Sequence, residues 1–316
     1  MTGLFTPASL IRLAGFLFLV TSADLLRADS ITLFAAADAT LIERNPSNSL
    51  GAASWFTAGI TQNGNTNRAL LKFDVAGALA PGSTIIFAGL NVWVTGQPRD
   101  GYAETSFSLR RMFRPWGEGP NGDPPTSPGF GLPAQPGDAT WLTTFWDTNA
   151  WAIPGGLEGV DYSESPSTTA TIGGPRPQPY FFEAGDAITD VQFWLDRPDQ
   201  NFGWMLRSDL EVGLEARFTA RRFGSRELED PNTSPQLVLE YLPPMFITNV
   251  QVVADQIAMS FPTDFGHTYR IEWKPVTGST NTWNTLTNFG LILSPGSRTA
   301  TDSLSNTQRF YRLRRD

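Results

Sequence analysis

The chain has 316 residues, a formal net charge of −8 and no cysteine. The absence of cysteine excludes a disulfide framework, a thiolate metal site and a cysteine nucleophile. Residues 29–243 carry a net charge of −11 and residues 244–316 a net charge of +2, and an acidic main domain argues against non-specific nucleic-acid binding, which needs a basic surface.

The first 28 residues have the pattern of a secretory signal peptide. Arg12 precedes an apolar run, Leu13 to Val20, and small residues follow that would permit cleavage after Ala23 or after Ala28. The apolar run is well short of the roughly 20 residues that span a bilayer, which disfavours an uncleaved anchor. We therefore expect a signal peptide of residues 1–23 or 1–28, a secreted protein that is extracellular or at the cell surface, and no membrane span.

Short strand-like runs separated by Gly, Pro, Asn or Asp recur through residues 29–243, among them "ITLFAAADATL", "RALLKFDV", "TIIFAGLNVWV" and "PQLVLEY". This pattern predicts an all-β domain with the architecture of a sandwich or barrel. One helix is expected in "AGDAITDVQFWLDRPD", with Asp186 at the N-cap, Val191 and Leu195 at helical spacing, and Pro198 as the stop.

The run "NRALLKFDV" has two different faces when its residues are taken alternately as in a strand. The apolar set predicts a face in the core: Ala69, Leu71, Phe73 and Val75. The other set carries three charges: Arg68, Lys72 and Asp74.

Residues 116–180 are rich in Pro and Gly and contain four tryptophans. A long irregular segment inside a compact domain is usually functional or disordered, and the tryptophans argue against disorder, which is poor in aromatic residues. Pro243 and Pro244 then end the main domain. Residues 244–316 predict a small second β-sandwich, near the lower size limit for independent folding.

An ordered set of short motifs in the main domain resembles the DNRLRE family, a secreted bacterial and archaeal β-sandwich module. The motifs include "AADATL", "NPSNSLG", "NRALLKFDV", "RPWGEG", "ATW", "ITDVQFWL", "NFGWML", "FGSRE" and "SPQLVLEY". The resemblance implies a jelly-roll-like sandwich and non-catalytic polysaccharide binding, since some members are carbohydrate-binding modules that recognise alginate and many others have no known ligand. The last 70 residues resemble fibronectin-III-like modules through "YRIEW", Trp283 and "RFYRLRR".

Arginines alternate along three of the predicted strands and suggest a face for an acidic glycan. "SFSLRRMFR" places Arg110 and Arg114 together, and "EARFTARRF" places Arg217, Thr219 and Arg221 together. Arg binds carboxylates through two parallel hydrogen bonds, so Arg110 and Arg114 are predicted to contact the ligand. Lys72, which shares a strand face with Arg68, is the third predicted cationic contact. The alternative is that the charges pair within the protein. We predict such a structural set of Arg68, Asp74, Arg226 and Glu227.

Tryptophans in or beside the long segment could stack on sugar rings, because binding surfaces favour Trp and Tyr. The predicted contacts are Trp116, Trp141 and Trp151. The alternative is that they cap the open end of the sandwich, since large aromatic side chains are mostly buried.

No cofactor is expected. Loops such as "AADAT", "NGNTN", "NGD" and "ELEDPN" offer oxygen ligands that suit calcium, but Asp and Asn are also ordinary turn residues, so a structural calcium ion is not established. Catalysis has little support: His267 is the only histidine and has no motif around it, and Glu118 in "WGEGP" is a candidate acid with no identified partner.

The sequence therefore favours a secreted, non-enzymatic protein that binds an acidic polysaccharide such as alginate, with cell-surface or extracellular-matrix association. The first alternative is a structural or adhesive surface protein without a glycan ligand, whose charges serve folding alone. A glycosidase or polysaccharide lyase is the less favoured alternative.

Overall fold

The computed structural model describes residues 28–98, 101–173, 178–183, 185–276, 282–304 and 308–315. The predicted signal peptide lies almost wholly outside these residues. The chain divides into two compact units, and the division falls between Gln251 and Val252. Each unit is described separately.

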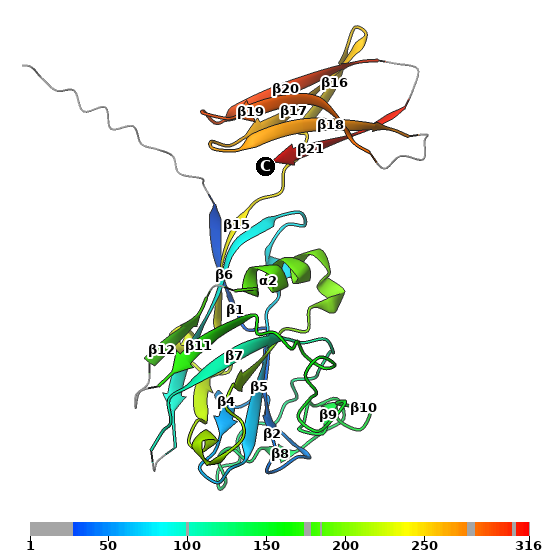
Figure 1. The fold of residues 1–316 in the computed structure, drawn as a ribbon. Helices are drawn as coiled ribbons and strands as arrows, with labels where there is room; N and C mark the ends of the chain where they lie inside the picture. The colour runs from blue at the N-terminus through cyan, green and yellow to red at the C-terminus, as the bar shows by residue number, and fades with distance from the viewer. Residues whose placement is uncertain are drawn as a thin grey trace, which may run out of the picture. The chain divides into compact units, whose positions relative to one another are not determined.

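The first unit is built from short strands with few helices, as its turn-rich sequence predicts (Figure 1). Its strands are β1 Asp29–Phe34, β2 Ala37–Ile42, β3 Asn48–Ser49, β4 Trp55–Ile60, β5 Thr66–Lys72, β6 Thr84–Gly96, β7 Thr105–Arg111, β8 Leu132–Pro133, β9 Thr143–Phe145, β10 Asn149–Ala150, β11 Thr168–Ile172, β12 Gln178–Phe182, β13 Trp204–Ser208, β14 Arg221–Gly224 and β15 Gln236–Leu242. Its helices are α1 Val75–Ala78, α2 Ala187–Asp196 and the 3₁₀ turns η1 Pro198–Gln200, η2 Leu214–Ala216 and η3 Pro231–Thr233.

The strands form two antiparallel layers that share one strand. The first layer contains β1, β15, β6, β14 and β4, with β12 on β6, and the second contains β5, β13, β7 and β11, with β2 on β5. Strand β4 pairs with β14 through residues 55–58 and with β5 through Gly59 and Ile60. Gly59 has φ +102°, and a Cβ there would lie 2.7 Å from a neighbouring carbonyl oxygen, so glycine permits this corner. The predicted all-β sandwich is confirmed.

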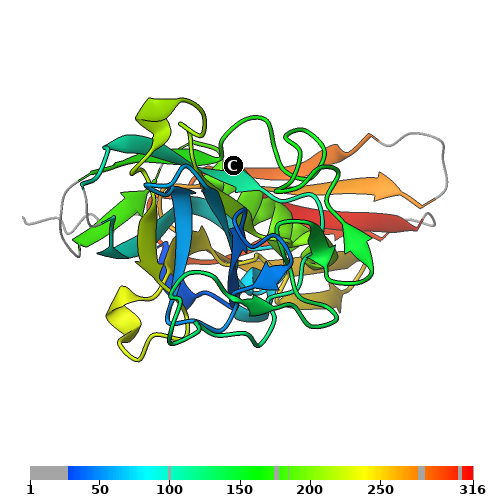
Figure 2. The same ribbon diagram turned by 90° about the horizontal axis from the view of Figure 1, so that it is seen from below.

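The main core lies between the two layers, and α2 covers one end of it (Figure 1). In the view of Figure 2 this helix lies behind the strands. The alternation predicted for "NRALLKFDV" holds: Ala69, Leu71, Phe73 and Val75 are all fully buried. Helix α2 begins after Asp186 as predicted and buries Val191 and Leu195, although Asp186 makes no side-chain capping bond. Trp194 of α2 packs edge-on against Trp204 of β13, with ring centroids 4.5 Å apart.

A second apolar cluster lies on the opposite face of the β5 layer. Leu70 and Met205 point to this side, and the long segment after β7 covers them with Trp141, Trp151 and Tyr162. The irregular segment between β7 and β11, residues 112–167, is thus folded over one face of the sheet, and we call it the covering segment. This explains its tryptophan content and leaves that face largely inaccessible.

The second unit consists of two three-stranded antiparallel sheets, β16-β17-β20 and β19-β18-β21 (Figure 1). The strands are β16 Asn249–Val253, β17 Gln256–Thr263, β18 Thr268–Pro275, β19 Asn284–Leu291, β20 Gly296–Ser303 and β21 Arg309–Arg315. Its core is small and includes Met259, Phe261, Tyr269 and Ile271. Throughout the described parts of both units, no helix has the length and apolar character to cross a membrane.

Candidate functional site

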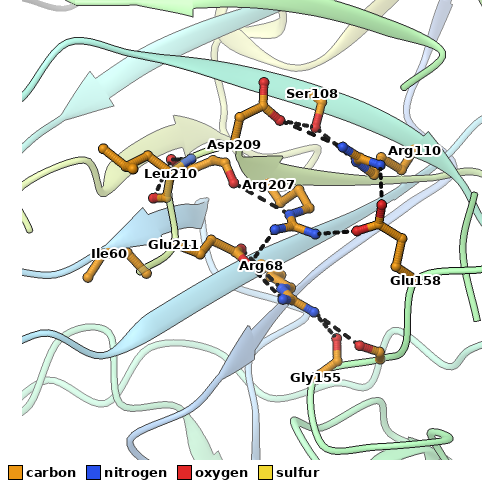
Figure 3. A network of polar contacts seen from close by, with 12 residues as sticks. Ile60, Arg68, Ser108, Arg110, Gly155, Glu158, Arg207, Asp209, Leu210 and Glu211 are labelled. Atoms are coloured by element: carbon orange, nitrogen blue, oxygen red, sulfur yellow. Dashed lines mark hydrogen bonds and ion pairs between the residues drawn. The ribbon is translucent and has the colours of Figure 1, made fainter. Parts of the chain in front are cut away.

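The arginines of the β5 layer are engaged by acidic side chains of the protein itself (Figure 3). Arg68 of β5 binds both carboxylate oxygens of Glu211, at 3.1 and 2.6 Å, and donates to the carbonyl of Gly155 at 2.8 Å. Arg68 therefore pairs with Glu211 and not with the predicted Asp74 or Glu227. The reason is that the loop after β13 brings Glu211 beside Arg68, whereas Asp74 turns away to cap α1 by accepting a hydrogen bond from the Gly77 amide.

Neighbouring strands extend this network into a ladder of three arginines. Arg207 of β13 contacts Glu211 at 2.7 Å and Glu158 at 3.3 Å. Arg110 of β7 contacts Glu158 at 3.2 Å and has Asp209 at 4.0 Å (Figure 3). The sequence predicts Arg110 as a ligand contact, but its side chain is 12% exposed and its donors point to protein oxygens.

The charge of Arg68 is compensated within the protein. Burial alone would lower the pKa of Arg68, but its hydrogen bonds to Glu211 and the charge of that carboxylate raise the pKa above its ordinary value. A carboxylate ligand would have to displace these protein carboxylates. The ladder therefore joins strands β5, β13 and β7 to the covering segment.

The two other cations predicted to contact a ligand, Arg114 and Lys72, differ in whether an acidic residue of the protein pairs with them. Arg114 contacts the fully buried Asp161 at 2.9 Å, and Asp161 also accepts hydrogen bonds from the amides of Ala152 and Leu157. Arg114 thus anchors the covering segment. Lys72 is half-buried and forms no ion pair with any residue in the described ranges.

The predicted tryptophan contacts belong to the second apolar cluster. Trp151 is buried and donates from Nε1 to the Thr140 carbonyl at 2.8 Å, and Trp141 is 9% exposed. Trp116 packs against the same cluster and donates to the Phe202 carbonyl at 2.9 Å. Trp141 and Trp151 are buried by protein and Trp116 is partly buried against them, which agrees with the capping alternative.

An acidic cluster joins motifs that lie far apart in the sequence. Asp38 of "AADATL", Glu118 of "WGEG" and Glu227 of "FGSRE" have oxygens within 4.8 Å of one another. Arg226 lies among them: it binds both Glu118 oxygens, at 2.6 and 2.8 Å, and Glu227 at 2.9 Å. The predicted pairing of Arg226 with Glu227 is therefore present.

Glu118 and its neighbours are poorly arranged for catalysis. Besides Arg226, Glu118 accepts a hydrogen bond from the Asp38 amide at 2.8 Å, so both of its oxygens are engaged by protein. Burial raises the pKa of Asp38 well above its usual range, against the opposing hydrogen bond from the Arg226 amide. Three carboxylates could hold a hard cation such as calcium, but the guanidinium of Arg226 already supplies the positive charge there.

The other acidic loops have local structural contacts. Asp123 of "NGD" accepts the Gly129 amide at 2.7 Å, and Asp230 of "ELEDPN" caps η3 by accepting the Asn232 amide at 3.0 Å. His267 lies between β17 and β18 and contacts the ring of Tyr269 edge-on. These are ordinary turn contacts.

A groove of about 530 Å³ on the outward face of the β4–β14–β6 layer provides a different site. Phe56 and Phe223 stack in the core with ring centroids 5.3 Å apart, so Trp55 and Arg222, their sequence neighbours, face outward. Residues 128–130 of the covering segment form the opposite wall. The polar and apolar lining includes Thr57, Gln62, Asn67, Gln97, Pro98 and Phe130.

Arg222 is the distinctive residue of this groove. Its guanidinium carbon lies 3.9 Å from the centroid of the Trp55 ring, a cation–π contact that holds the side chain in place. Burial lowers the pKa of Arg222, with the charge of Asp123 opposing this effect, but an arginine remains cationic at neutral pH. Among the residues that the structure describes, no carboxylate forms an ion pair with Arg222.

Gln97 adds an unused acceptor to the lining. Its Oε1 atom is buried and accepts no hydrogen bond from the residues that the structure describes, which is uncommon for a buried polar atom. The groove thus combines an aromatic ring with a positive charge that no carboxylate of the described residues pairs with.

In "EARFTARRF" the sequence pattern predicted Arg221 on an exposed face, whereas the arginine that faces outward is Arg222. Alternation placed Arg217, Thr219 and Arg221 on one exposed face, but Phe218 has φ +69°, which breaks the strand before β14. Arg221 is in consequence fully buried and donates to the carbonyls of Phe218, Thr219 and Ala220. Only the pairing of β14 with β4 shows that Arg222 faces outward beside Trp55.

Comparisons with known proteins add little to this geometry. No family model matches the chain, and no curated protein matches it. One similar solved structure is the β-glucuronidase of Parabacteroides merdae, which is 10% identical with a TM-score of 0.17. The alignment covers 84% of this chain and 30% of the β-glucuronidase chain.

Proposed function

We propose that this chain is a secreted, non-catalytic binding protein for an acidic polysaccharide, and that the groove of Trp55 and Arg222 is its binding site. The observation that carries the proposal is the Arg222 guanidinium, which is stacked on Trp55 in a groove and has no carboxylate partner in the described residues. A uronic acid carboxylate is a natural partner for such a group, because Arg binds carboxylates with two parallel hydrogen bonds.

The rest of the lining suits a sugar chain. Sugar rings have apolar C–H faces for Trp55, Pro98 and Phe130, and hydroxyls for the half-buried polar side chains Gln62 and Gln97. The proposed assignment to the DNRLRE family agrees with this function. Of the motifs that carry the resemblance, "AADATL", "RPWGEG" and "FGSRE" supply the acidic cluster, and "NRALLKFDV" supplies Asn67 of the groove lining.

A non-enzymatic role is proposed from the state of the acidic residues. Glu118 is the best acidic candidate, yet protein donors engage both of its oxygens. No carboxylate lines the groove within the described residues, whereas hydrolysis of a glycosidic bond requires two.

The test is binding of the full chain to alginate, pectin and neutral glucans at low and high salt. Retention by the acidic polymers should be lost in Trp55→Ala and in Arg222→Gln and preserved in Lys72→Gln, which removes one positive charge from the layer first predicted to bind. EDTA should not change the result. Loss of retention in Lys72→Gln with no effect of Arg222→Gln would contradict this assignment.

The second candidate is a structural or adhesive surface protein without a glycan ligand. The compensated ladder of Arg68, Arg110 and Arg207 favours it, because there the arginines stabilise the fold. Absence of binding to every polysaccharide from a folded sample would select this function.

A further inference from the structure

The arginines of the first unit form two groups that lie in different parts of the fold. Those of the ladder, together with Arg111, Arg114 and Arg226, pair with carboxylates of the protein. Among the residues that the structure describes in this unit, the arginines without an ion pair are Arg44, Arg197, Arg217, Arg221 and Arg222. All of these except Arg197, which follows α2, lie in the groove or beside its walls. The arginine charge that no ion pair neutralises is therefore concentrated around the groove.

Arg44 lies over the wall that the covering segment contributes. Its guanidinium carbon is 4.6 Å from the centroid of the Phe130 ring, and Phe130 lines the groove. Arg44 is exposed in the turn between β2 and β3, and Glu43, its acidic neighbour in the sequence, accepts the amide of Thr66. The cation–π contact limits the freedom of the long side chain, so less entropy is lost when an anion binds it.

Arg217 lies beside another wall, the turn of residues 61–65. A Cβ on Gly64 would be 3.5 Å from the Nε atom of Arg217, and Thr61 and Gln62 of the same turn line the groove. Arg217 is exposed, and its backbone forms a bridge with Ile60 at the end of β4. The guanidinium of Arg222 lies over Trp55 at the start of β4, and the two ends of a strand of this length are roughly 16 Å apart. Positive charges are thus present at both ends of the β4 side of the groove.

The charge of Arg221 adds to these. This side chain is fully buried and donates hydrogen bonds to backbone carbonyls, which satisfy its donors but carry no net charge. The acidic residue that acts on Arg222 is Asp123, whose Oδ1 atom accepts the amide of Gly129. No carboxylate of the described residues lines the groove itself, so the positive charge there exceeds the negative charge, in a chain whose overall charge is −8.

We propose that the groove binds a stretch of polyuronate in which successive sugars carry a carboxylate, and that Arg44 and Arg217 contact carboxylates other than the one held by Arg222. This inference rests on the proposed function and narrows its ligand from an acidic polysaccharide in general to a contiguous polyuronate. A single carboxylate can satisfy Arg222 alone. Cations at separated positions along one groove can be used together only by a chain that is charged at several positions, and contacts made by one chain reinforce one another.

The experiment is calorimetric titration of the full chain with hexagalacturonate and with the same oligomer methyl-esterified on most of its carboxylates. Arg44→Gln and Arg217→Gln should each lower the affinity for hexagalacturonate about fivefold at low salt, and added salt should reduce this difference. Both should leave the weaker affinity for the esterified oligomer unchanged to within about twofold. Arg197→Gln is the matched control, because it removes one exposed arginine without an ion pair from the same unit, away from the groove, and it should bind as the parent does.

Parent-like binding of hexagalacturonate by Arg44→Gln and Arg217→Gln, with binding lost in Arg222→Gln, would overturn this inference and leave the proposed function in place. Equal affinity of the parent for the two oligomers would also overturn it, because contiguous carboxylates would then not be needed. A loss in Arg197→Gln as large as in the other two variants would reduce the effect to net charge and contradict the named contacts. Absence of binding of either oligomer by the folded parent would contradict the proposed function itself.

Discussion

The Arg222 guanidinium carbon lies 3.9 Å from the centroid of the Trp55 ring, although Arg222 of β14 is paired with Thr57, two residues along β4 from Trp55. The wall opposite them depends on Gly129, which has φ +89° and would place a Cβ 3.4 Å from Trp55 and 3.9 Å from Arg222. This proximity connects the shape of the covering segment to the binding residues.

The first prediction is that Gly129→Ala narrows the groove and lowers the affinity for acidic oligosaccharide by about tenfold. An alanine at this backbone angle costs about 1 kcal/mol of folding stability. Gly137→Ala is the matched control, because Gly137 has φ +99° in the same segment and no atom lies within 4 Å of the position that its alanine methyl would take. Calorimetric titration should show weaker binding for Gly129→Ala alone, and equal affinities would contradict the role of this wall.

The second prediction concerns the arginine ladder. Arg68→Met should reduce the free energy of unfolding by about 3 kcal/mol, because it leaves Glu211 largely buried with Arg207 as its remaining ion-pair partner. Lys72→Met on the same strand should change it by less than about 1 kcal/mol, since Lys72 forms no ion pair with the described residues. Urea denaturation of the two variants provides the comparison, and similar midpoints would show that the ladder does not stabilise the fold.

Local patterns predicted the layers of the sandwich better than they predicted the site. The alternation in "NRALLKFDV" correctly places Ala69 and Leu71 in the core, because a strand with one apolar face must bury that face. The same alternation identifies Arg68 as lying outside the core but cannot identify Glu211 as its partner. That pairing depends on a loop 143 residues away in the sequence.

The covering segment explains why side chains that the sequence predicted to face a ligand are buried in the structure. A strand with charges on its second face is ordinarily exposed there, but Trp141 and Trp151 bury this second face. Their positions in a Pro- and Gly-rich segment gave no indication of which surface they would cover. Trp55 and Arg222 meet only through the long-range pairing of β4 with β14, and for that reason no local motif marked the groove.

The third prediction separates the two kinds of tryptophan. Trp141→Ala should cost about 3–5 kcal/mol of stability, because the side chain is 9% exposed and packs in the second apolar cluster. Trp55→Ala should cost less and abolish polysaccharide binding. Thermal denaturation and binding are measured on both variants, and retained binding by Trp55→Ala would contradict the site.

The fourth prediction is a pH dependence that originates at Asp38. Burial raises the pKa of this carboxyl in the folded protein above its ordinary value of 3.8. The folded state therefore holds the proton more tightly than the unfolded state, so the stability contributed by Asp38 is complete below pH 3.8 and is lost as the pH rises through the folded pKa. Asp38→Asn should remove this loss, because the amide oxygen can still accept the hydrogen bond that the Arg226 amide donates at 2.9 Å.

The measurement is the free energy of unfolding of the parent and of Asp38→Asn from about pH 4 to pH 8, the range in which a raised carboxyl pKa acts. The variant should become more stable relative to the parent as the pH rises. Burial also raises the pKa of Asp190 and of Glu227. Both residues are unchanged in the two proteins, but Glu227 has an oxygen within 4.8 Å of Asp38, so the difference between the two curves reports Asp38 together with its coupling to Glu227. A constant difference across the range would show that Asp38 titrates alike in the folded and unfolded chains, and a variant that loses stability with rising pH would reverse the sign.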